Sequence, residues 1–156
     1  FATIVNNIGL QPIIINGKTL KSINQYYNKQ RAKALSYIGR GSSKRTRRLD
    51  LKRNNIVNTH LHRMSRYIIN YCIENDIKNI TVGRNKDWKR GMDIGKRNNQ
   101  NFIQLPYEKF ISQLEYKGEE VGISVSVIDE RYTSKSSFID NDILPKKFGD
   151  YEFLII

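Results

Sequence analysis

The segment from residue 77 to residue 128 most constrains the fold, because it alternates strand, loop, helix and strand. Ile77–Val82 is short and β-branched, and Val121–Ile128 alternates apolar and polar residues, as strands do. Between them, Pro106–Gly118 has helical periodicity and begins with a proline, which a first helical turn tolerates. Such a crossover places the two strands parallel and close together in one sheet. The sequence therefore predicts an α/β fold.

The residues before this unit predict a hairpin followed by a helical pair. Two short apolar runs, Ala2–Val5 and Pro12–Ile15, are separated by turn-forming residues and predict antiparallel strands. Residues 19–75 have helical periodicity with one break, after which Ser42 or Ser43 could cap the second helix. At 156 residues the chain is predicted to be a single domain, with a mixed sheet, flanking helices and a helical insertion.

Positive charge is concentrated in the first third of the chain. The net charge is +12; residues 1–53 hold 12 Lys and Arg with one acid, whereas residues 54–156 hold 15 with 14 acids. A basic segment of this kind predicts a polyanionic partner. The alternative is a solvated surface that keeps the protein soluble.

Two cationic clusters are candidates for contacts with nucleic acid. The first opens the second helix of the pair, which we expect to project beyond the core and to contact phosphates through Lys44, Arg45, Arg47, Arg48, Lys52 and Arg53. The second is the loop after the strand near residue 80. It combines cations for phosphates, amides for base edges and one ring for stacking, in Arg84, Lys86, Trp88, Lys89, Arg90, Lys96, Arg97, Asn98 and Asn101.

Cysteine and histidine give little indication of metal or redox chemistry. The single cysteine, Cys72, is on the apolar side of a predicted helix and is interpreted as a core thiol in a reducing compartment. His60 and His62 are two residues apart and so point to different sides of a helix. No apolar run approaches the roughly 18 residues of a membrane span, and we expect a cytoplasmic protein.

Residues 98–138 resemble the OrfB/TnpB family of transposon-encoded proteins. The matching elements are NFIQLPY with the helix after it, EVGISVSVI as the next strand, and YTSKSSF at its end. Residues 48–55, RLDLKRNN, and the opening FATIVNN fit the same family. The resemblance implies an RNase H-like (RuvC-type) nuclease domain related to the type V CRISPR effectors. It also implies RNA-guided DNA cleavage, with DNA and guide RNA as partners.

The resemblance further implies a two-metal centre, in which three acids hold two Mg²⁺ ions about 4 Å apart. The first and last acids are expected before Phe1 and after Ile156, and Gly83 holds the place of the middle one. Glu130 is the candidate substitute, both as a catalytic residue and as a metal ligand, and Asp129 is the next choice. The alternative for Glu130 is a surface carboxylate paired with a neighbouring cation.

Other expectations concern zinc, the chain ends and rival functions. The zinc ribbon common in the family begins with cysteine pairs, but Ser136 and Ser137 occupy that place, so no zinc is expected. Both ends of the chain are apolar and resemble the ends of a truncated domain, so the chain alone is expected to bind nucleic acid without cutting it. The rivals are a non-catalytic nucleic-acid-binding module or degenerate relic, and an RNA-binding structural protein of translation.

Overall fold

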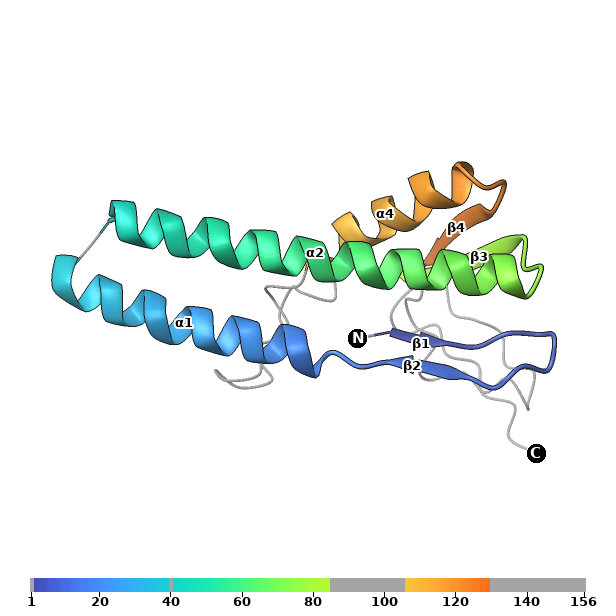
Figure 1. Ribbon diagram of the computed structural model, residues 1–156, viewed down its shortest axis with the longest axis horizontal. Helices are drawn as coiled ribbons and strands as arrows, with labels where there is room; N and C mark the ends of the chain where they lie inside the picture. Colours follow the sequence, from blue (N-terminus) through green and yellow to red (C-terminus); the bar gives the residue numbers. More distant parts are fainter. Residues whose placement is uncertain (1, 40, 85–105, 130–156) are drawn as a thin grey trace, which may run out of the picture.

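The computed structural model describes residues 2–39, 41–84 and 106–129. Figure 1 shows a long helical hairpin beside a smaller group of strands and a third helix. The elements in chain order are β1 (Ala2–Ile4), β2 (Ile13–Ile15), α1 (Lys18–Ile38), α2 (Lys44–Glu74), β3 (Asn79–Arg84), α4 (Tyr107–Glu119) and β4 (Ser124–Asp129). This order confirms the predicted mixed α/β composition.

The strand pairings agree with the prediction, but the number of sheets does not. β1 and β2 pair antiparallel, and β3 and β4 pair parallel, as predicted. Within the described residues these are two separate two-stranded sheets, so the expectation of one mixed sheet is not met there. Both pairs instead pack apolar side chains against one common core, with Ile4 and Ile15 from the first and Ile80 and Val125 from the second.

The ranges of β3 and β4 differ most from the prediction. β3 runs beyond Val82 through Gly83, which pairs with Ile128 instead of ending the strand. β4 begins three residues later than predicted, because the chain turns at Gly122 with a φ of 75°. In that turn the Gly118 carbonyl accepts the amide N–H groups of Val121 and Ile123, at 3.0 and 2.8 Å.

The helical pair is an antiparallel hairpin whose second helix has a strong N-terminal cap. Ser43 is the cap: its side chain accepts a hydrogen bond from the Thr46 amide at 3.2 Å, and the Thr46 hydroxyl accepts one from the Ser43 amide at 2.8 Å. This reciprocal pattern is a capping box and fixes where α2 begins. The half of the hairpin near the cap extends beyond the strands and α4 (Figure 1).

The core lies where α2 packs against α4 and the start of α1. It consists of Leu20, Val57, Leu61, Ile68, Ile69, Cys72, Phe110, Leu114 and Ile123. Cys72 is buried, and burial raises the pKa of its thiol, in agreement with the interpretation of a core residue. Among the described helices, none is long and apolar enough to span a membrane.

Candidate nucleic-acid interface

Polar contacts hold α1 against α2, and two of them engage the carboxylate of Asp50. The Tyr27 hydroxyl donates to Asp50 Oδ1 at 2.6 Å, and Arg31 Nε lies 3.6 Å from the same oxygen. Arg53 Nε donates to Asn24 Oδ1 at 2.9 Å. Asp50 is the one acid of residues 1–53, so the negative charge of this segment is engaged at the helix interface.

Burial at this helix interface changes the pKa of two of the groups that make these contacts. Burial, followed by the hydrogen bond to Asp50, raises the pKa of Tyr27. Burial also lowers the pKa of the Arg53 guanidinium, which lies 5.9 Å from the centre of the Tyr27 ring. Arg53, predicted as a phosphate contact, is thus engaged within the hairpin in this structure.

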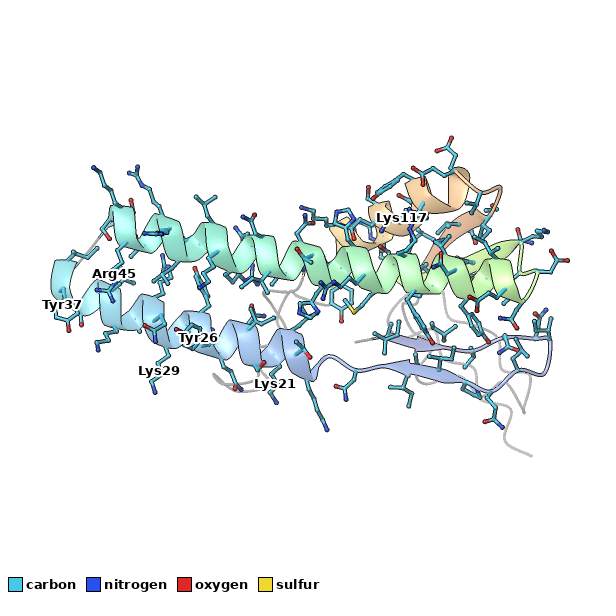
Figure 2. All side chains as sticks on the ribbon, viewed as in Figure 1. Lys21, Tyr26, Lys29, Tyr37, Arg45 and Lys117 are labelled. Atoms are coloured by element: carbon cyan, nitrogen blue, oxygen red, sulfur yellow. The ribbon has the colours of Figure 1, made fainter. Side chains whose placement is uncertain are left out.

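The other five predicted cations at the start of α2 are exposed. Lys44, Arg48 and Lys52 follow one another at four-residue spacing and so share one side of the helix. Within the described part of the chain, no carboxylate pairs with these five residues, which are Lys44, Arg45, Arg47, Arg48 and Lys52. On α1, Lys21, Tyr26 and Lys29 extend away from α2 (Figure 2). The outer surface of the hairpin is therefore cationic.

The carboxyl edge of the β3–β4 pair contains Gly83, which holds the place of the middle acid, and Asp129, a candidate substitute for that acid. Arg84 of β3 is in register with Asp129 of β4, and Gly83 with Ile128. Arg84 Nη2 forms an ion pair with Glu108 Oε2 at 3.1 Å, at the start of α4, while its buried Nε has no hydrogen-bond partner among the described residues. The parallel crossover thus places the backbone of Asp129 at this edge.

The described residues do not by themselves form a metal site. Gly83 offers no side-chain oxygen at the edge, and among the residues the structure describes there is no group of three or more His, Cys, Asp or Glu that could hold a metal ion. The remaining predicted residues lie outside the described ranges: Lys86, Trp88, Lys89, Arg90, Lys96, Arg97, Asn98, Asn101 and Glu130.

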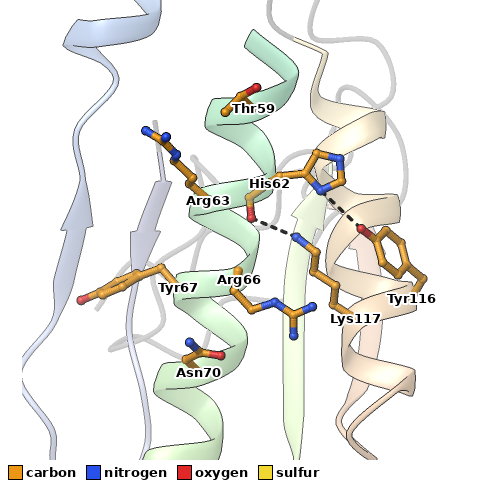
Figure 3. A pocket seen from close by; sticks show the side chains of 8 residues that line it. All are labelled: Thr59, His62, Arg63, Arg66, Tyr67, Asn70, Tyr116 and Lys117. Atoms are coloured by element: carbon orange, nitrogen blue, oxygen red, sulfur yellow. Dashed lines mark hydrogen bonds between the residues drawn. The ribbon is translucent and has the colours of Figure 1, made fainter. Parts of the chain in front are cut away.

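A further basic surface, over α2 and the end of α4, was not predicted. It is an open hollow of about 630 Å³ lined by Thr59, His62, Arg63, Arg66, Tyr67, Asn70, Tyr116 and Lys117 (Figure 3). Helical spacing in the sequence could have indicated that its α2 residues lie on one side. The contribution of Lys117 depends on tertiary contacts, because this side chain is buried at the end of α4.

These features define a basic mixed α/β protein built from a long helical hairpin and a parallel strand crossover. Residues 1–89, more than half of the chain, match the OrfB_IS605 family, described as probable transposase. The chain belongs to that family. Residues 107–142 match a second description, the Cas12f1-like TNB domain. The resemblance found in the sequence is therefore confirmed.

This chain is similar in sequence to part of a known nuclease and similar in fold to part of a solved complex. A CRISPR-associated endodeoxyribonuclease Cas12f1 from Sulfoacidibacillus thermotolerans is 36% identical over 100 residues, which is 62% of this chain and 22% of the relative. A cryo-EM structure of a Cas12f1–sgRNA–target DNA complex has a similar fold, with a TM-score of 0.61 and 20% identity. That similarity covers 83% of this chain and 33% of the other.

The expectation that no zinc is bound gains no support from these findings. The match to the TNB domain extends through residue 142, beyond the last described residue, and so includes Ser136 and Ser137. These two serines carried the expectation, and their placement is not described. The absence of zinc stays a prediction.

Proposed function

We propose that this chain is the nucleic-acid-binding core of a TnpB-like, RNA-guided DNA endonuclease with a RuvC-type domain, acting on DNA with a guide RNA in the cytoplasm. The observation that carries the proposal is the cationic outer surface of the α1–α2 hairpin, from which the one local acid is withdrawn. Family membership supports it, as does the similar fold in a protein solved with sgRNA and target DNA.

Binding would act mainly through phosphates. Lys44 to Lys52 span about 12 Å along the helix axis, at 1.5 Å per residue, so these cations form a compact, rigid row. Cations that neutralise phosphates release condensed counterions, which makes affinity depend steeply on salt. Exposed, unpaired lysine and arginine side chains suit this role, because no ion pair within the described chain must first be broken.

Salt-dependent binding tests this part of the proposal. For a labelled 20-nucleotide single strand, the Arg48→Gln variant should reduce the slope of log affinity against log salt by about 0.7, the contribution of one phosphate contact. The matched control is Lys78→Gln, which removes the same charge from a residue paired with Asp76 at 2.6 Å. A flat salt response of the unaltered chain would contradict the proposal.

For the intact nuclease we propose Asp129 and Glu130 as catalytic residues, with Glu130 as a ligand of Mg²⁺. When bound, magnesium would supply the Lewis-acid chemistry of phosphodiester hydrolysis. One observation supports this part of the proposal: Asp129 is the last residue of β4 and so lies at the carboxyl edge of the parallel pair. Gly83 at that edge favours the second candidate, a non-catalytic module that binds nucleic acid and does not cut it.

Cleavage by the full-length protein with guide RNA and Mg²⁺ separates the two. Asp129→Asn and Glu130→Ala should each abolish cutting and leave target binding unchanged. The control Asp76→Asn, which changes an acid before the opposite, amino end of β3, should cut normally. Normal cutting by both the Asp129→Asn and the Glu130→Ala variant would remove these acids from the proposed site. Binding without any cutting by the unaltered protein would favour the non-catalytic module.

A further inference from the structure

The hollow over α2 and α4 contains a buried ammonium that forms no salt bridge among the residues the structure describes. The Lys117 side chain is 4% exposed, and its Nζ donates to the His62 carbonyl oxygen at 2.9 Å and to Ser65 Oγ at 2.6 Å. Both acceptors are neutral, and within the described residues no carboxylate pairs with Lys117. Burying a charge in this way is costly unless the charge is paired. The site is therefore suited to an anion.

The neighbouring groups add positive charge to the same place. Burial and then the charge of Arg66 lower the pKa of Lys117, while the charge of Glu120 acts to raise it. Burial with the charges of Lys117 and Lys109 lowers the pKa of His62. None of the eight lining residues is an acid. Glu120 is near the rim, 3.6 Å from Arg66, and both of these side chains are about half exposed. One solvated carboxylate thus faces a surplus of cations.

The hollow lies on the same side of α2 as the cationic start of that helix. Arg48 and Arg66 are 18 residues apart, which is five helical turns and about 27 Å. At 100° per residue, Lys52 and His62 fall within about 40° of these two arginines. The cations near the cap and those of the hollow therefore lie along one face of α2, with the neutral residues Asn55 and Thr59 between them on that face.

We propose that the hollow is a second nucleic-acid subsite, which binds the phosphodiester backbone of the strand that crosses the hairpin. Arg66 and Lys117 contact a phosphate there: an ammonium has three N–H donors, and two of those on Lys117 are engaged with protein acceptors. Tyr67 and Tyr116, from α2 and α4, flank these cations and offer partly exposed rings to the adjoining bases (Figure 3). This proposal rests on the proposed function and extends it to residues outside the predicted clusters.

Binding of the full chain to labelled 20-nucleotide RNA and DNA strands of one sequence tests the subsite. Arg66→Gln should weaken binding by about 3- to 10-fold at 0.1 M salt and reduce the salt slope by about 0.7. Because Arg66 is a rim residue, the melting temperature should stay within a few degrees of the unaltered chain. Lys117→Met should also reduce the slope, and Lys78→Gln should leave it unchanged. A loss confined to the RNA or to the DNA strand identifies which of them occupies the hollow.

The outcomes distinguish this subsite from the proposed function. If Arg48→Gln weakens binding while Arg66→Gln and Lys117→Met bind with unchanged affinity and slope, the hollow is no subsite and the hairpin remains one. If the unaltered chain binds neither strand, both proposals fall. If Lys117→Met alone lowers affinity, with a lowered melting temperature and an unchanged slope, Lys117 ties α4 to α2 and the subsite is overturned.

Discussion

The hydrogen bond from Tyr27 to Asp50 should stabilise the helical hairpin measurably. It joins α1 to α2 at 2.6 Å, and the side chain of Asp50 is 41% exposed. A hydrogen bond to a charged group contributes about 1.5 to 3 kcal/mol when buried, and partial exposure lowers that value. The Arg31 ion pair to the same oxygen adds at most about 1 kcal/mol. We expect Tyr27→Phe to lower the free energy of unfolding by about 1 to 1.5 kcal/mol.

A double-mutant cycle isolates this bond. Urea unfolding of Tyr27→Phe, Asp50→Asn and the double variant should give a coupling energy of about 1 kcal/mol. For a chain of this length the single Tyr27→Phe change should lower the melting temperature by about 3 to 5 °C. The matched control is Tyr26→Phe, because the neighbouring ring is 65% exposed and loses the same hydroxyl. A coupling energy below about 0.3 kcal/mol would refute the interaction as a source of stability.

Alkaline titration gives the same bond a second signature. The folded pKa of Tyr27 is raised above 10.0, so its contribution to stability is complete below pH 10 and is lost as the pH rises through the folded pKa. Asp50→Asn removes the charge and weakens the hydrogen bond, two of the causes of the shift, while burial remains. The loss of stability above pH 10 should therefore be smaller in that variant than in the unaltered chain.

Three further changes test other parts of the fold. Gly118→Ala should destabilise by about 1 to 2 kcal/mol, since its Cβ would lie 2.7 Å from the Ile123 carbonyl oxygen, while Ser112→Ala on the same helix should not. Ser43→Ala should cost about 1 kcal/mol in urea unfolding by removing the cap of α2; an unchanged midpoint would contradict the capping box. The pKa of His62 is lowered from 6.5, so the unfolded chain binds a proton more readily and stability is lost as the pH falls. The melting temperature should therefore fall between pH 7.5 and pH 5.5, and it should fall less steeply in the His62→Gln variant.

The local features of the fold could be predicted from sequence because short-range chemistry decides them. Alternation and β-branching identified β4, and the serines before a helical period narrowed the cap to Ser42 or Ser43, of which the structure has Ser43. The parallel pairing of β3 with β4 followed from the handedness and length of a strand–helix–strand unit. These are properties of neighbouring residues or of one connection, so a single sequence contains them.

Other features depend on tertiary packing and could not be predicted. A lysine at the end of α4 looks like a solvated side chain, yet Lys117 is buried because its ammonium donates hydrogen bonds to Ser65 Oγ and to the His62 carbonyl oxygen of α2. Similarly, Arg53 belongs to the cationic run in sequence, but Asn24 of α1 turns it inward. Among the described residues, the strands form two pairs that share one core, and this tertiary arrangement is not recorded in local periodicity.

The continuity of α2 has a mechanical consequence. This helix of 31 residues is about 46 Å long at 1.5 Å per residue, and it contains neither proline nor glycine, where sharp kinks usually occur. It therefore acts as a stiff lever that lacks a hinge of its own. A force on the projecting end is therefore transmitted along the rod to its contact with α4, where Lys117 donates to the His62 carbonyl oxygen and to Ser65 Oγ. These buried polar contacts resist a displacement of α2 against α4.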